Sequence, residues 1–115
     1  MRYTILIILL IGTILFSCTN DEITPTDLVC QPDINYDNTM EAIINNSCAI
    51  PTCHVVGGNA PGVYTSFQGI LGDLESGQVE DEVVVQRDMP RLPGVLTEEE
   101  FELFQCWLIA GHPEN

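Results

Sequence analysis

Two cysteines and a histidine near the middle of the chain, Cys48, Cys53 and His54, have the residue types best suited to chemistry. Two thiols can add to the two vinyl groups of a haem, and an adjacent imidazole can reach the iron. The usual order is C-x-x-C-H, whereas four residues separate these cysteines. The pattern predicts a variant attachment site for one haem c, with Cys48 and Cys53 as thioethers and His54 as proximal ligand.

A second iron ligand is expected far along the chain, on a loop that folds over the other haem face. Met89 lies 35 residues after His54, in a stretch rich in proline and glycine. Pro90 fixes the backbone beside this methionine and removes one backbone donor. A thioether opposite an imidazole raises the reduction potential and fills the sixth iron site, which indicates electron transfer.

The same residues allow other interpretations. The two motif cysteines can form a disulfide with each other or pair with Cys30 and Cys106, because four cysteines allow three connectivities. A zinc site would need a fourth ligand beside the motif residues, such as His112, at an uncommon spacing. His112 is also a rival distal haem ligand, and Met89 alone would ordinarily be a core or surface residue.

The first 17 residues have the pattern of a secretory signal. Arg2 precedes an apolar run over residues 5–16, which is too short to span a bilayer comfortably. The run ends just before Cys18, as in the cleavage box of a bacterial lipoprotein. We expect residues 1–17 to be removed and Cys18 to be acylated. The alternatives are a plain signal peptide with a chance cysteine, or an uncleaved anchor.

The remaining chain divides into a polar tether over residues 18–29 and one domain over residues 30–115. Acyl chains at Cys18 would hold the protein on a membrane surface. Export implies a periplasmic or cell-surface location on a bacterial membrane. Cysteines other than Cys18 should then be bridged or ligated, since that compartment is oxidising.

The chain is strongly acidic, with 17 acidic residues, 3 basic ones and a formal net charge of −14. Nucleic acid and anionic lipid surfaces are therefore excluded as favourable partners. A basic redox partner fits this charge, although an acidic surface that keeps an exported protein soluble explains it equally well.

Two short helices are predicted on either side of a glycine-rich loop at residues 57–62. Apolar residues at helical spacing over residues 36–44 predict the first, capped by Asp37 or Asn38 and running into Cys48. Pro51 makes a regular continuation beyond that cysteine unfavourable.

The second helix is expected to begin after Thr65 or Ser66 and to run through Leu71, with Gly72 as its stop. The segment 79–85 fits either a helix or a short strand, because its valine run favours strand whereas its acidic residues suit a first helical turn.

The last helix has the clearest signals. Thr97 and Glu100 form a capping-box pattern, and the helix should run to about Ala110, with Gly111 as its stop. Cys106 lies on the more polar side of this helix, a reasonable place for a bridge. One broad arc is apolar and should be core; it contains Phe101, Leu103, Phe104, Trp107 and Leu108.

In these features the chain resembles the small cytochrome c-like domains of exported lipoproteins from Bacteroidetes-type bacteria. Those domains have a widened C-x4-C-H motif, a later Met-Pro like that at 89–90, and a last helix like residues 96–100 followed by 107–111. The resemblance covers roughly residues 30–115. It implies an all-α, class I cytochrome c-like fold whose first and last helices cross, one covalent haem c and one-electron transfer. The chain departs from many relatives in having a single proline after the methionine.

If haem takes the two motif cysteines and lipid takes Cys18, then Cys30 and Cys106 remain as a pair. In an oxidising compartment we expect them to form a disulfide that joins the start of the domain to its last helix. The alternative is two free thiols.

The sequence therefore predicts a membrane-tethered monohaem c-type cytochrome that exchanges single electrons with separate redox proteins. No general acid, base or nucleophile arrangement is evident, so neither an enzyme activity nor a small-molecule substrate is expected. The alternative is a haem-free, disulfide-stapled surface lipoprotein that acts as a binding module. The two hypotheses predict different colours for the purified protein: the cytochrome would be red because of its haem, and the haem-free module would be colourless.

Overall fold

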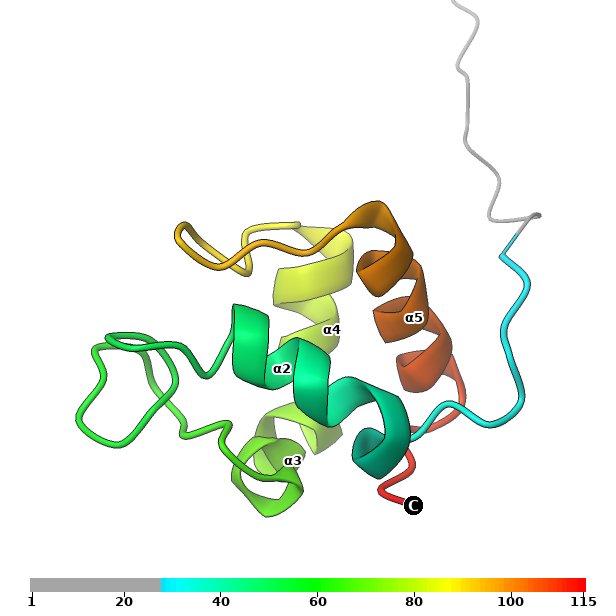
Figure 1. Ribbon diagram of the computed structural model, residues 1–115, viewed down its shortest axis with the longest axis horizontal. Coiled ribbons are helices and arrows are strands. Elements are labelled where there is room, and N and C mark those ends of the chain that lie inside the picture. The colour runs from blue at the N-terminus through cyan, green and yellow to red at the C-terminus, as the bar shows by residue number, and fades with distance from the viewer. Residues whose placement is uncertain (1–27) are drawn as a thin grey trace, which may run out of the picture.

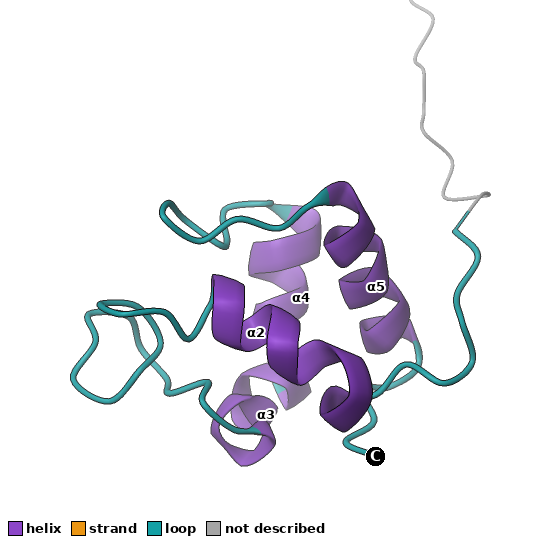
Figure 2. Cartoon of the chain, in the orientation of Figure 1, coloured by secondary structure: helices purple, strands orange, loops and turns teal. Residues whose placement is uncertain are grey.

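The computed structural model describes residues 28–115, and this range consists of helices and loops without a strand (Figures 1 and 2). The expected all-α class is confirmed. No described helix is long and apolar enough to cross a membrane. The predicted signal, Cys18 and most of the tether lie outside the described residues.

The first helix consists of a π-helical turn, η1 (Tyr36–Met40), that runs directly into α2 (Glu41–Ser47). Asn35 caps it: its side chain accepts the Asn38 backbone N–H at 2.9 Å, and the Asn38 side chain accepts the Asn35 N–H at 3.1 Å. The predicted caps were therefore wrong by a few residues. Asn35 has the extended backbone that a capping residue needs.

The second helix is α3 (Phe67–Glu75), and Ser66 caps it as expected, by accepting the Gly69 N–H at 3.2 Å. The predicted stop at Gly72 was wrong, because the helix continues for another three residues. An interior glycine costs about 1 kcal/mol relative to alanine, which does not by itself end a helix. The turn comes instead at Gly77, whose φ of 78° suits glycine.

The ambiguous valine-rich segment is helical. A short α4 (Gln78–Glu80) continues as the π-helical η2 (Asp81–Val85). Val79 and Val83 lie four residues apart and are both buried. Helical spacing therefore places them on one inward face, whereas a strand would have placed every second side chain there.

The last helix, α5 (Glu98–Ile109), confirms the predicted boundaries. Thr97 and Glu100 form the capping box, with the Thr97 hydroxyl accepting the Glu100 N–H at 3.2 Å. Gly111 follows the helix with a φ of 84°, as the stop signal indicated.

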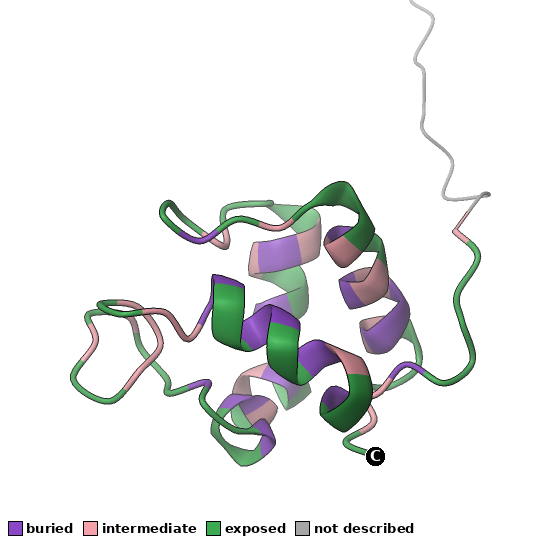
Figure 3. Ribbon diagram, in the orientation of Figure 1, coloured by how far each residue is buried: buried purple, intermediate pink, exposed green. Residues whose placement is uncertain are grey.

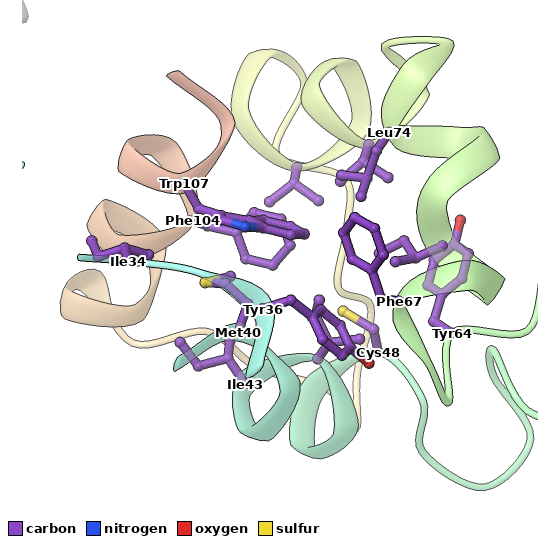
Figure 4. Close-up of a cluster of buried hydrophobic side chains, with 14 of the residues drawn as sticks. Ile34, Tyr36, Met40, Ile43, Cys48, Tyr64, Phe67, Leu74, Phe104 and Trp107 are labelled. Atoms are coloured by element: carbon purple, nitrogen blue, oxygen red, sulfur yellow. The ribbon is translucent and has the colours of Figure 1, made fainter. Parts of the chain in front are cut away.

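The core lies where these helices face one another (Figure 3), and Trp107 and Phe104 of α5 are fully buried at its centre (Figure 4). Tyr36 of η1 lies 6.4 Å from Trp107, centroid to centroid, so the first and last helices pack together. The other side chains with 1% exposure or less are Met40, Ile44 and Ile70.

The carboxyl-terminal residues bind the start of the first helix. The backbone N–H groups of Tyr36 and Asp37 donate to the carbonyls of Pro113 and Glu114 at 2.9 and 3.0 Å. The Trp107 indole N–H also donates to the Pro113 carbonyl, at 2.9 Å. Donors that a helix start would otherwise leave unsatisfied are thus paired by the chain end.

A disulfide joins Cys30 to Cys106, which confirms the predicted bridge. The two Cα atoms are 5.3 Å apart, and the residues are 76 positions apart in the sequence. The bridge ties the segment before the first helix to the buried side of α5. Cys106 is itself buried, so the polar side of the helical wheel faces another segment at this point.

Replacing Cys30 and Cys106 together by alanine should lower the free energy of unfolding by up to about 4 kcal/mol, because the bridge closes a long loop in the unfolded chain. Urea unfolding of both proteins without reductant measures the difference. Reduction of the parent protein should produce a similar loss. Equal unfolding midpoints for the parent and the double variant would contradict the role of the bridge.

Candidate functional site

The four predicted haem residues, Cys48, Cys53, His54 and Met89, all line one cavity of about 410 Å³. This volume is within the usual range for cofactor and small-molecule sites. Residues from each of the later helices complete a largely apolar wall: Ile70, Val79, Val83 and Phe104. Segments 35 residues apart in the sequence therefore meet at one site.

The cysteine pair is placed by the end of α2. The helix ends at Ser47, with Cys48 as its cap, and no regular helix continues towards Pro51, as the sequence indicated. The turn itself comes at Thr52, whose φ of 73° is uncommon outside glycine. The His54 N–H then donates to the Cys48 carbonyl at 3.2 Å, which returns the histidine to the end of the helix.

Two contacts orient the His54 imidazole. Its Nδ1 lies 2.7 Å from the carbonyl oxygen of Pro61, and because a carbonyl only accepts, Nδ1 is the donor. In the neutral ring, Nε2 then keeps its lone pair. The Tyr64 ring stacks on the imidazole, with centroids 4.0 Å apart and planes within 5°.

Gly58 lets the motif loop, residues 48–66, pack closely against the backbone of the cysteine–histidine segment. A Cβ atom at Gly58 would lie 1.8 Å from the Cys53 carbonyl oxygen, so only glycine fits there. Asn59 donates its backbone N–H to the Thr52 carbonyl at 2.9 Å, and Tyr64 donates its own to the His54 carbonyl at 2.9 Å. The loop thus folds back on the cysteine–histidine segment.

Met89 is half-buried on the loop that joins η2 to α5, residues 86–97, called the Met89 loop below. At its start, the N–H groups of Asp88 and Met89 both donate to the Glu82 carbonyl, at 2.9 and 3.2 Å. Near its end, the Ser47 hydroxyl donates to the Val95 carbonyl at 2.8 Å. The loop is therefore bound to the last residue of α2, next to the first cysteine.

Close backbone approach reinforces this attachment. A Cβ atom at Gly94 would lie 2.2 Å from the Ser47 carbonyl oxygen. Any side chain at this position would push the Met89 loop away from α2. Ser47 is the buried polar residue of the core, and its hydroxyl is satisfied by the same loop.

Burial controls the chemistry of the first cysteine. Cys48 is 9% exposed and lies among the buried side chains (Figure 4). Burial, and to a lesser extent the nearby Cys53, raises the pKa of its thiol to about 11. Among the cysteines that the structure describes, Cys48 and Cys53 are free thiols, and neither is paired with Cys30 or Cys106.

The competing ligand sets receive no support from the geometry. Within residues 28–115, no three histidine, cysteine, aspartate or glutamate side chains gather as a metal site, so the proposed zinc set is not assembled. His112 packs against Trp107 at 6.2 Å between ring centroids and is not among the residues lining the cavity.

Several contributors to the site carry no recognisable sequence signal. They are Ser47, Pro61, Tyr64, Arg91 and Gly94. Pro61 acts through a backbone carbonyl, which every residue has, and Gly94 acts through the absence of a side chain. Arg91 lines the cavity from the Met89 loop and supplies its cation. The one available signal was the proline and glycine content of the two loops, because glycine permits close approach of the backbone.

Alkylation of the haem-free protein should be slower at Cys48 than at Cys53 under mildly alkaline conditions. The raised pKa of Cys48 leaves little thiolate, and burial restricts the reagent. Timed iodoacetamide labelling followed by peptide mass mapping gives both rates. In denaturant the rates should converge. Equal rates in the folded protein would contradict the burial of Cys48.

The site must be interpreted from its own geometry. No protein-family model matches the chain, and neither a curated protein nor a solved structure is significantly similar to it.

Proposed function

We propose that this protein is a membrane-tethered monohaem c-type cytochrome that carries single electrons. The observation that carries the proposal is the meeting of Cys48, Cys53, His54 and Met89 on one largely apolar cavity. A haem offers vinyl groups for the thiols, an iron for the other two side chains and apolar faces for the walls. Bound there, it supplies a one-electron redox centre.

The residues present fit such a group. His54 donates Nδ1–H to a backbone carbonyl, the arrangement that commonly orients a metal-ligating histidine and leaves Nε2 for the metal. Arg91 lines the same cavity and suits a carboxylate, which haem carries as propionates. Each thiol S–H of Cys48 and Cys53 would add across one vinyl C=C, forming one C–S and one C–H bond.

Met89 and His54 are the residues that would bind the iron, and a thioether ligand would favour the reduced state. If both residues bound the iron, the chain would leave no open iron site for a small molecule, so we propose no enzyme activity. The helical class and the packing of η1 on α5 support a class I cytochrome c-like fold. A lipid at Cys18 would place the protein on a periplasmic or cell-surface membrane face, with separate redox proteins as partners.

Expression in a host that matures c-type cytochromes should give a red protein with a covalently attached haem. Denaturing gels and intact mass should show one haem per chain, and the pyridine haemochrome spectrum should indicate two thioether bonds. Cys48→Ala or Cys53→Ala should change that spectrum to the single-thioether form. The matched control is the Cys30→Ala/Cys106→Ala pair, which should keep it. A colourless protein would contradict the cytochrome proposal and favour the haem-free binding module.

Met89→Ala should abolish the weak far-red band of ferric His/Met haem and lower the midpoint potential, because the thioether favours ferrous iron. Leu92→Ala is the matched control, since Leu92 lies on the same loop, is 85% exposed and does not line the haem cavity. Spectroelectrochemical titration of both variants gives band and potential together. If Met89→Ala behaves like Leu92→Ala, the sixth ligand is another group.

A further inference from the structure

Tyr64 stacks on the His54 imidazole and is itself held by further contacts. The two rings are nearly parallel, with centroids 4.0 Å apart. Tyr64 is 8% exposed and lines the same cavity as His54. It lies at the end of the motif loop, just before α3, so the helix start limits its movement.

Tyr64 is itself held from α3. Its hydroxyl donates to Asp73 Oδ2 at 2.6 Å, and its backbone N–H donates to the His54 carbonyl at 2.9 Å. A Cβ atom at Gly62 would lie 2.7 Å from the Tyr64 ring and 3.0 Å from Asp73 Oδ2. Glycine at this position therefore leaves room for the phenol and the carboxylate to meet.

One hydrogen bond fixes the plane of an imidazole only loosely. The contact from Nδ1 to the Pro61 carbonyl limits rotation about the Cβ–Cγ bond, but a hydrogen bond tolerates about 30° of misalignment. A second ring stacked on its face removes this freedom. For a histidine bound to iron, the orientation of the imidazole plane decides which iron orbital it overlaps, and outer partners commonly set it.

We propose that Tyr64, anchored by Asp73, is a positioning residue that sets the plane of the His54 imidazole at the iron. This inference rests on the proposed haem function. Asp73 is not among the residues that line the cavity, so its effect on His54 would be exerted through the phenol that it binds. The structure thus assigns the chain His54–Tyr64–Asp73 to orientation of the ligand.

The test compares ferric proteins by electron paramagnetic resonance and by the hyperfine-shifted haem methyl signals in proton NMR. Both respond to the ligand plane and are insensitive to a loss of stability alone. Tyr64→Phe keeps a ring and removes the anchor, Asp73→Asn weakens the anchor, and Tyr64→Leu removes the stack. We expect altered g values and a changed methyl pattern, smallest for Asp73→Asn and largest for Tyr64→Leu.

Tyr36→Phe is the matched control, because Tyr36 is buried, does not line the cavity, and its hydroxyl has no hydrogen-bond partner within residues 28–115. It should leave both spectra unchanged. Haem content is measured first for every protein. Red Tyr64 and Asp73 variants with parental spectra would overturn this inference alone, whereas a colourless parent protein would overturn the haem function and this inference with it. Should Tyr64→Leu not fold, Tyr64→Phe and Asp73→Asn still decide the outcome.

Discussion

The approach of the Gly94 backbone to the end of α2 is the constraint on which the site depends. The Met89 loop reaches the cavity because residue 94 has no side chain to hold it off the Ser47 carbonyl. The Ser47 hydroxyl then binds the same loop one residue further on. Because Cys48 follows Ser47 directly, one contact fixes the distance between the two halves of the site.

The helices form a small frame, and covalent and hydrogen-bonded links join its first and last helices. The disulfide joins the start of the domain to α5, and the carboxyl-terminal carbonyls pair the free N–H groups of the first helix. A domain of this size has a thin core and gains from such links. These links fix the helices, and the motif loop and the Met89 loop then supply the cysteines, the histidine and the methionine of the cavity.

The cavity joins residues of different chemical character. A buried thiol with a raised pKa, an imidazole oriented by a carbonyl, a thioether and an arginine lie around largely apolar walls. Burial leaves little of the first cysteine as thiolate at neutral pH. Together these features support the haem site that we propose.

The sequence by itself determined the residue types available for chemistry and most of the helix ends. Ser66, Thr97 and Gly111 were predictable because a cap or a stop acts within about four residues of its own position. The Asn35 cap was missed because Asp37 and Asn38 offered competing cap signals nearby. Gly72 was taken as a stop, although one interior glycine does not by itself end a helix. Only the tertiary structure decided that Met89 meets the motif residues and that Tyr64 stacks on His54. Those contacts join distant segments through backbone carbonyls and missing side chains, and packing, rather than local pattern, determines them.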